Sequence, residues 1–348
     1  MKSQLPKKML VMNILEILKL YSDVDHTLSQ KDILDFLRTK YDMVVDRKAV
    51  KRNLMNLIEF GYDIEYSETI RKNKKGEDEL VCSGWYLRHD FEDSELRLLI
   101  DSLLFSKHIP YNQCKDLIEK LKGLSGSFFS VRVKHIRNLP EKFPENKDLF
   151  LTIEVLDEAI SKEHQVSFHY NNYDIDKRLH PRKNENGIVR EYIVNPYQMV
   201  ATNGRYYLVC NYDKYDNVAN YRIDRISDIT LLDSRVKDRK LVKGIEKGLD
   251  LPKHMAEHIY MFAGDSINVK FRAKRYIVTE IIDWFGFDAV FTNENYDEVD
   301  VTVKVNENAM LCWALQYSPH IEILEPKKLR DEVCKAIKEM SGKYEIGG

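Results

Sequence analysis

The chain has 348 residues, which is enough for two or three domains with cores of their own. Its hydrophobic content of 43% and charged content of 32% indicate a soluble globular protein, and no run approaches the roughly 18 apolar residues of a membrane span. The net charge of −2 excludes a global attraction to nucleic acid, so contact with DNA would need a local basic patch. The five cysteines form no Cys-x-x-Cys pair, which favours reduced thiols in a cytoplasm over a disulfide framework or a cysteine-rich zinc site.

Three helices are predicted in the first 60 residues. The first spans Met9 to Tyr21, and polar residues interrupt its apolar run, so we expect an amphipathic helix and not a signal peptide. Ser29 is a suitable N-cap for a second helix over Gln30 to Lys40. The third helix would begin after the N-cap candidate Asp46 and end before Gly61.

The third predicted helix has an apolar stripe and a basic remainder. The stripe recurs at helical spacing and consists of Val50, Leu54, Leu57 and Ile58. The exposed surface near the start of the helix carries four basic residues, Arg47, Lys48, Lys51 and Arg52. This pattern is typical of a helix-turn-helix, in which the N-terminal end of the recognition helix enters the major groove. These four side chains would contact base edges or phosphates.

Two strands are predicted after the third helix, Ile64 to Tyr66 and Gly84 to Leu87, with a basic loop at residues 71–76 between them. Lys72, Lys74 and Lys75 of this loop would bind the flanking DNA backbone. Residues 1–90 therefore predict a winged helix-turn-helix. The alternative is a helical protein–protein module whose basic residues form a solvated face.

Residues 91–148 predict a helical connector. Ser94 to Phe105 has a broad apolar stripe, with Ser94 as its N-cap, and Gln113 to Leu121 is spaced to pack against it. Two glycines then open a less regular segment. An apolar helix in this position could also mediate dimerisation.

A short helix, Thr152 to Glu163, precedes a region of alternating strands that begins with Val166 to Tyr170. Further on, Tyr206 to Cys210 is aromatic and apolar, and Tyr221 to Ile226 alternates apolar and charged residues, which predicts a hairpin with one wet face. Its aromatics could stack on a ligand, and its arginines could fork onto a phosphate or carboxylate. An ordinary antiparallel pair in a small barrel would have the same composition.

Two segments of this hairpin resemble the WYL domain: Gly204-Arg205-Tyr206-Tyr207-Leu208 and Tyr221-Arg222-Ile223-Asp224-Arg225-Ile226. Tyr206 stands where the family has the tryptophan of its name and keeps a large amphipathic aromatic. The resemblance implies a bacterial, five-stranded, SH3-like β-barrel over residues 149–235 that senses a ligand inside a transcriptional regulator. It also implies that the ligand is a nucleotide or a single-stranded nucleic acid.

Several basic residues are candidates for this ligand site. Arg178, His180 and Arg182 share one face of a predicted extended run and could line a polyanion site, although His180, followed by Pro181, could equally be a structural edge residue. The remaining candidates come from the hairpin and from the C-terminal region, where Arg272 would complete the site from a neighbouring subunit: Arg205, Tyr206, Tyr207, Arg222, Arg225 and Arg272.

A charged linker at residues 236–262 leads to a C-terminal domain at residues 263–348. The strand Ile267 to Arg272 alternates strictly, and the elements that follow have the order β-α-β-β-α-β, which predicts a ferredoxin-like α+β domain. The region resembles the WCX extension that follows WYL domains, including the run Ile321-Glu322-Ile323-Leu324-Glu325-Pro326. The whole chain is thus predicted to be a multidomain α+β protein.

The linker contains a competing motif. His254-Met255-Ala256-Glu257-His258 matches the H-x-x-E-H pattern of inverzincin zinc enzymes. The segment is only about two helical turns long and lies outside a recognisable protease scaffold. We therefore expect a solvated helix, with a zinc hydrolase built on His254, Glu257 and His258 as a remote alternative.

The sequence predicts a cytoplasmic, homodimeric regulator that binds double-stranded DNA and responds to a negatively charged ligand. We expect no enzymatic activity, no cofactor, no metal ligands and no membrane partner. The runner-up is a nucleic-acid-binding accessory protein without promoter specificity.

Overall fold

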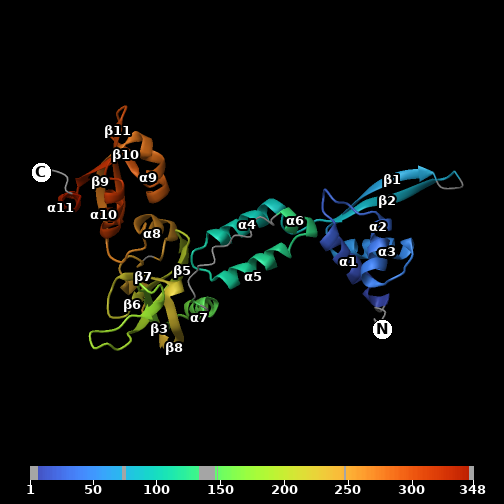
Figure 1. Ribbon diagram of the computed structural model, residues 1–348, viewed down its shortest axis with the longest axis horizontal. Coiled ribbons are helices and arrows are strands. Elements are labelled where there is room, and N and C mark those ends of the chain that lie inside the picture. The colour runs from blue at the N-terminus through green and yellow to red at the C-terminus, as the bar shows by residue number, and fades with distance from the viewer. Residues whose placement is uncertain (1–6, 73–75, 133–145, 147, 247, 345–348) are drawn as a thin grey trace. The chain divides into compact units, whose positions relative to one another are not determined.

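The computed structural model describes residues 7–72, 76–132, 146, 148–246 and 248–344 (Figure 1). The chain divides into two compact units, Met1–Phe143 and Pro144–Gly348. Both contain helices and antiparallel sheets, so the expected multidomain α+β organisation is confirmed at this level. The finer domain boundaries at residues 90, 148, 235 and 262 stay predictions.

The first unit begins with three helices that enclose one apolar core. After a 3-10 turn at Lys7–Met9, the helices are α1 (Leu10–Tyr21), α2 (Gln30–Tyr41) and α3 (Arg47–Phe60). Each buries one stripe and leaves its polar face to solvent, as amphipathic helices do. The central side chains of the core are fully buried: Ile14, Leu18, Ile33, Leu37, Val50 and Leu54.

The predicted caps of α2 and α3 are present. The Ser29 hydroxyl accepts the Asp32 N–H, and the Asp32 carboxylate accepts the Ser29 N–H, which completes a capping box. The Asp46 carboxylate accepts the Ala49 N–H at 2.6 Å. Gly61 ends α3 at φ +112°, a left-handed conformation that favours glycine. These caps set where α3 starts and hence where its basic residues lie.

The hairpin after α3 is longer than the sequence predicts. β1 (Ile64–Lys72) and β2 (Asp78–Leu87) pair almost to the tip, so Arg71 and Lys72 belong to a strand and the predicted 71–76 loop is wrong for them. Cross-strand neighbours explain the extension, because β-branched and aliphatic side chains such as Ile70 and Leu80 face each other there.

The rest of the first unit consists of α4 (Asp93–Phe105), α5 (Tyr111–Lys122) and α6 (Ser127–Arg132). Glu92 is the N-cap of α4 and forms a capping box with Glu95, so the predicted cap at Ser94 is wrong by two residues. The buried positions Leu96 and Ile100 of α4, and Cys114 and Ile118 of α5, lie at the helical spacing expected for an inward stripe.

The second unit starts with α7 (Leu149–Lys162), which packs against a six-stranded antiparallel sheet. Its central path is β4-β3-β5-β6-β7, and β8 pairs with β3. The sheet therefore has one strand more than the five that the resemblance implies. The strands are β3 (His164–Tyr173), β4 (Leu179–Pro181), β5 (Glu191–Thr202), β6 (Arg205–Tyr212), β7 (Val218–Arg222) and β8 (Ile226–Arg235).

The predicted strand from Tyr221 to Ile226 is wrong in its second half. β7 ends at Arg222, and Ile223–Arg225 forms a 3-10 turn before β8. Because a 3-10 turn repeats every three residues, Ile223 and Ile226 both point inward and are fully buried. Alternation of apolar and charged residues over so few positions does not distinguish this turn from a strand.

The segment between β8 and the C-terminal sheet packs against the six-stranded sheet. It contains a 3-10 turn at Arg239–Leu241 and the helix α8 (Leu251–Glu257). Val242 and Ile245 are buried against Tyr197, whose hydroxyl donates to the carbonyl of Lys237 at 2.9 Å. The predicted linker is therefore an ordered part of the second unit.

The C-terminal sheet has the strand order β10-β11-β9-β12, and the element order β-α-β-β-α-β is the predicted one. Its core centres on Phe271, Phe285 and Trp313. No helix in the described part of the chain is long and apolar enough to cross a membrane. The elements are β9 (Ser266–Lys274), a 3-10 turn at Arg275–Ile277, α9 (Val278–Phe285), β10 (Val290–Thr292), β11 (Glu298–Asn306), α10 (Glu307–Gln316), β12 (Ile321–Glu325) and α11 (Lys327–Lys343).

Candidate ligand-binding and nucleic-acid-binding sites

The basic residues predicted on α3 lie at its N-terminal end, outside the buried stripe. Arg47, Lys48 and Arg52 are exposed, and Lys51 is half-buried. Within residues 7–72 and the other described segments, none of the four forms an ion pair. Asp46 is the nearest acidic residue in sequence, and it is engaged in capping the helix. The front of α3 is therefore cationic and accessible, as a surface that meets phosphates must be.

The β1-β2 hairpin, where the sequence predicts a wing, carries less unpaired positive charge than the sequence indicates. Strand register places Lys72 directly opposite Asp78 and Arg71 opposite Glu79. Opposite charges in such cross-strand pairs attract, which offsets part of the basic charge at this end of the hairpin. Lys74 and Lys75, the other two predicted backbone contacts, lie outside the described residues.

Two of the predicted ligand residues in the second unit form ion pairs with one carboxylate, and a third lies next to it in sequence. Asp224 is 0% exposed, and the Arg222 guanidinium forks onto it, with Nε to Oδ1 at 3.0 Å and Nη2 to Oδ2 at 2.6 Å. Arg205 Nη1 lies 3.8 Å from Asp224 Oδ2. Arg225 follows directly in the same 3-10 turn. Together these residues carry three positive charges and one negative charge, a formal excess of two. We call Arg205, Arg222, Asp224 and Arg225 the arginine cluster.

The fold fixes the turn that carries this cluster. The Asn146 side-chain amide donates to the carbonyls of Asp224 and Ile226, each at 3.1 Å. The backbone N–H of Arg222 donates to the Tyr170 hydroxyl at 3.1 Å. Contacts from two other parts of the unit therefore hold the backbone on both sides of Asp224, and the arginines project from a rigid base.

Arg225 has an unused hydrogen-bonding group. Its Nε is buried and has no hydrogen-bond partner among the described residues. Its guanidinium carbon lies 5.9 Å from the centroid of the Tyr173 ring. A buried N–H without an acceptor is costly, and natural proteins usually satisfy such groups with protein, water or ligand. Arg225 thus has one donor that no described residue satisfies.

The electrostatics of the cluster favour a further negative charge. Burial, followed by the nearby Arg222, lowers the pKa of Arg205. Burial is also the largest influence on the pKa of Arg222 and acts to lower it, but the hydrogen bond with Asp224 and the charge of that carboxylate, with smaller contributions from Tyr207 and Tyr170, together raise the pKa. Asp224 therefore stabilises the charged form of Arg222 more than that of Arg205. The positive charge of Arg205 is held in a buried position beside another arginine, which is unfavourable. An anion bound here would relieve that cost.

The two tyrosines of the tripeptide lie on different faces of β6. Tyr207 is near the arginine cluster, and burial raises its pKa, so its hydroxyl stays protonated and can donate. Burial, together with Asp157, raises the pKa of Tyr206. Of the two predicted stacking residues, Tyr207 is the one that lies beside the arginines.

The remaining predicted residues lie outside the cluster. Arg178 is exposed, and no ion pair of its side chain occurs among the described residues. His180 Nε2 contacts Asp176 Oδ2 at 2.8 Å. Arg272 lies on β9, where its Nε donates to Asp300 Oδ1 at 3.0 Å. Hydrogen bonds from Asn293 and Arg272 lower the pKa of Asp300 to about 2.

Arg182 is connected to the cluster, although its neighbours Arg178 and His180 are not. Its guanidinium lies 5.0 Å from the centroid of the Tyr170 ring, the same tyrosine that accepts from Arg222. The aromatic side chains around Tyr170 form a continuous set in edge and stacked contacts: Phe168, Tyr170, Tyr192, Tyr212 and Tyr221.

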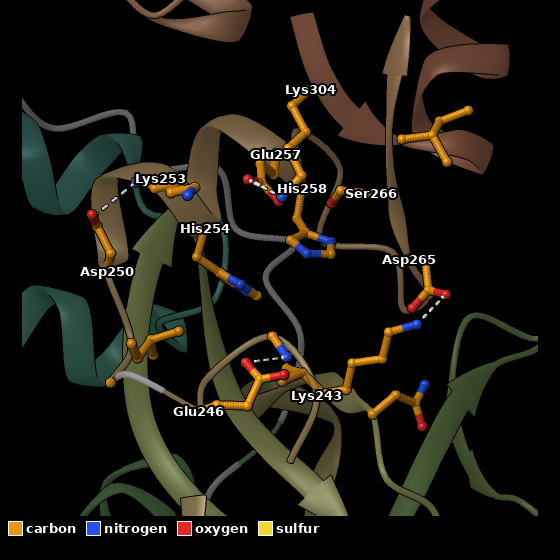
Figure 2. A pocket seen from close by; sticks show the side chains of 17 residues that line it. Lys243, Glu246, Asp250, Lys253, His254, Glu257, His258, Asp265, Ser266 and Lys304 are labelled. Atoms are coloured by element: carbon orange, nitrogen blue, oxygen red, sulfur yellow. Dashed lines mark hydrogen bonds and ion pairs between the residues drawn. The ribbon is translucent and has the colours of Figure 1, made fainter. Parts of the chain in front are cut away.

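The H-x-x-E-H segment forms the C-terminal part of α8 and its C-cap, His258, in the wall of a cavity of about 1160 Å³ within the second unit (Figure 2). His254 is only 8% exposed, so the expectation of a solvated helix is wrong for this residue. Glu257 forms an ion pair with Lys304 at 3.0 Å. Across residues 7–72, 76–132, 146, 148–246 and 248–344, no group of three or more His, Cys, Asp and Glu side chains is placed to hold a metal.

Comparisons with known proteins give the class of the second unit. The family model for the WYL domain matches residues 152–231, which contain the six-stranded sheet and the arginine cluster. The second unit thus contains a WYL domain. More particularly, the family model for the WCX domain matches residues 265–341, so the chain carries a WYL domain followed by a WCX domain. The resemblance found in the sequence is confirmed for both domains.

Two solved structures are similar to the chain at low identity. One is proteasome accessory factor B/C (PafBC) of Arthrobacter aurescens, with 14% identity, a TM-score of 0.30, and coverage of 93% of this chain and 47% of that chain. The other is a CRISPR Cas-related protein, with 14% identity, a TM-score of 0.38, and coverage of 97% and 84%. The chain thus spans about half the length of PafBC. No curated protein matches the chain.

Sequence reasoning missed two residues of the site. Asp224 stands inside the Arg-Ile-Asp-Arg-Ile run but was not assigned a role, although a single acid between arginines is the natural candidate for their shared partner. Asn146 had no local signal, because its contacts with the 223–225 turn span about 80 residues of sequence.

Proposed function

We propose that this protein is a cytoplasmic, ligand-responsive transcriptional regulator. Its first unit binds double-stranded DNA through a winged helix-turn-helix, and its WYL domain, an SH3-like barrel, binds a negatively charged ligand. The ligand class is a nucleotide or a single-stranded nucleic acid. The observation that carries the proposal is the arginine cluster, where Arg205 and Arg222 pair with one buried carboxylate and a buried N–H of the adjacent Arg225 lacks a partner among the described residues.

The DNA-binding half of the proposal rests on α3 and the hairpin that follows it. Arg47, Lys48, Lys51 and Arg52 form a cationic front without ion pairs to described residues, on a helix whose opposite face is buried. A helix followed by a two-stranded hairpin suits major-groove entry with phosphate contacts alongside. Lys72, Lys74 and Lys75 would supply the backbone contacts.

The ligand half of the proposal assigns roles within the second unit. Arg205, Arg222 and Arg225 would bind phosphate or carboxylate oxygens, since arginine does so in a forked geometry. Tyr207 would donate or stack beside them. Arg178, His180 and Tyr206 would contact only an extended ligand, and Arg272 would contribute from a neighbouring subunit.

Sequence-specific binding distinguishes this function from the accessory alternative. Fluorescence anisotropy would compare the duplex upstream of the protein's own gene with a scrambled duplex of equal length. A regulator of its own promoter is expected to bind the upstream duplex about 10³-fold more tightly. Equal, salt-sensitive binding to both duplexes would favour a nucleic-acid-binding accessory protein. Absence of binding to either duplex would contradict the assignment of α3 as a reading helix.

Acidic residues of the wing should weaken DNA binding. Asp78 and Glu79 lie opposite Lys72 and Arg71, so replacing both acids by Asn and Gln frees the two cations to contact phosphates. We expect affinity for duplex DNA to rise about threefold to tenfold, with a steeper dependence on salt. A control that instead replaces the exposed acids Asp331 and Glu339 of α11 by Asn and Gln should leave the affinity unchanged. An unchanged affinity in the wing variant would show that the hairpin does not approach DNA.

The connector is the proposed site of homodimerisation. Leu98 is 69% and Phe105 is 67% exposed, and their spacing of seven residues places both on one face of α4. Exchanging both for glutamate should convert a dimer into a monomer, because charged groups resist burial in an interface. Light scattering after gel filtration measures the mass. The exposed pair Phe287 and Tyr296 provides the matched control, and a dimer that survives the α4 change would place the interface elsewhere.

A further inference from the structure

Two histidines of α8 lie ring against ring in the cavity wall. The ring centroids of His254 and His258 are 4.3 Å apart, with an angle of 34° between the planes. The backbone N–H of His258 donates to the carbonyl of His254, so the pair keeps the helical i,i+4 spacing. Figure 2 shows both side chains extending from α8 toward the cavity of about 1160 Å³, which leaves room for water or a small ligand.

Each of the two rings has a hydrogen-bond partner at one nitrogen, which leaves the lone pair of its other nitrogen available. His258 Nδ1 lies 3.1 Å from the carbonyl oxygen of Phe262. A carbonyl can only accept, so Nδ1 carries the proton and Nε2 keeps its lone pair. His254 Nε2 lies 3.4 Å from Asn220 Oδ1, which orients that ring in the same manner. Metal-binding histidines characteristically donate their second N–H to a carbonyl or carboxylate in this way.

The charge state of the pair suits a metal ion. Burial, followed by the proximity of His258, lowers the pKa of His254 to about 4. Burial also lowers the pKa of His258. Both rings are therefore neutral at pH 7, as metal coordination requires. Neutral imidazole is a preferred ligand of Zn²⁺, Cu²⁺ and Ni²⁺.

We propose that His254 and His258 form an open, two-imidazole site for a divalent transition-metal ion, with water or a small ligand in the remaining positions. This is not the site of a zinc hydrolase, because Glu257, which would be its general base, is paired with Lys304. No third protein ligand is placed for the metal among the described residues, which gives a site of moderate affinity with open positions toward the cavity.

A metal ion here would act on β7, the strand that ends at Arg222 of the arginine cluster. His254 contacts Asn220 of β7, and Arg222 lies two residues further along the same strand. Glu257 joins the same helix to Lys304 of β11. Metal binding would thus fasten α8 between the WYL and WCX sheets. The inference is independent of DNA binding and of the anionic ligand.

Metal titration of untagged full-length protein tests the site. Isothermal titration with Zn²⁺, and absorption spectra with Co²⁺, should show one saturable site at micromolar concentrations. His254→Ala and His258→Ala should each weaken binding at least about tenfold, the lower end of the losses seen when even outer partners of a metal site are removed. His320→Ala removes a histidine whose Nδ1 contacts the Tyr276 hydroxyl and should bind as the wild type does.

Thermal unfolding separates loss of the site from loss of the fold. Saturating Zn²⁺ should raise the unfolding temperature of the wild type and of His320→Ala, and should leave both α8 variants unchanged. If His254→Ala does not fold, His258→Ala decides, because the His258 side chain is the less buried of the two. Absence of saturable uptake by the wild type, or equal uptake by a folded His258→Ala variant, would overturn the proposal.

Discussion

Replacing Arg225 by glutamine is expected to weaken binding of a short single-stranded oligonucleotide to this protein by about tenfold to a hundredfold. The reason is the loss of a charge-assisted hydrogen-bond donor, a contribution of about 1.5–3 kcal/mol. Arg225 is the best residue of the cluster to replace, because its Nε has no hydrogen-bond partner among the described residues. The forked contact with Asp224 is made by Arg222, so replacing Arg225 leaves that contact intact. Fluorescence anisotropy of a labelled oligonucleotide measures the affinity.

Two companion variants control this experiment. Arg178→Gln removes the same charge from an exposed arginine outside the cluster and should change the affinity less than about threefold. Arg222→Gln, and still more Arg222→Glu, should lose the ligand and also lower the unfolding temperature. Either change leaves the buried Asp224 carboxylate without its forked partner, which costs about 3–5 kcal/mol. If the wild type and Arg225→Gln bind the oligonucleotide equally well, the arginine cluster is not the ligand site.

Replacing the four basic residues at the front of α3 by glutamine is expected to abolish measurable binding to duplex DNA. If Arg47, Lys48, Lys51 and Arg52 each neutralise one phosphate, the slope of log affinity against log salt should fall by roughly 3–4, about 0.9 for each contact. Single substitutions would separate the roles. A residue that reads a base relaxes specificity at one position, whereas a phosphate contact weakens all duplexes alike.

The matched control changes the same net charge elsewhere in the chain. Lys115, Lys120, Lys335 and Lys338 are exposed and lie on α5 and α11. Their fourfold replacement by glutamine should leave DNA affinity within about threefold of the wild type. If both fourfold variants lose affinity equally, the attraction is a matter of overall charge, and α3 has no special role in DNA binding.

The parts of the fold that sequence predicts well have strong local signals. Ser29 and Asp46 cap the first turns of α2 and α3, and Gly61 caps the last turn of α3. Each cap makes its hydrogen bonds to residues three or four positions away, so the local sequence is enough to predict it. The β-α-β-β-α-β order of the C-terminal domain follows from clear changes of hydrophobic period. The wing was predicted too short, because its outer half is exposed on both faces and lacks alternation.

The candidate site was only partly predictable, because its geometry depends on distant contacts. Arg205, Arg222 and Arg225 could be named from the motif, and they do lie together. Their arrangement around Asp224 depends on the 3-10 turn at Ile223–Arg225. In the sequence, apolar and charged residues alternate from Tyr221 to Asp224, so the pattern predicts a strand there. The same-face argument that grouped Arg178 and His180 with them assumed a long strand, whereas β4 has three residues. The contact of Arg182 with Tyr170 has no sequence signature.

The central claim is that ligand at the arginine cluster changes DNA binding, and one titration tests it most directly. The affinity of the full-length protein for its upstream duplex would be measured by anisotropy with and without a saturating unlabelled single-stranded oligonucleotide. We predict a change of about fivefold or more in the wild type, the size of a typical allosteric coupling, and none in Arg225→Gln at the same oligonucleotide concentration. An unchanged DNA affinity in the wild type, or an equal change in the two proteins, would contradict the account.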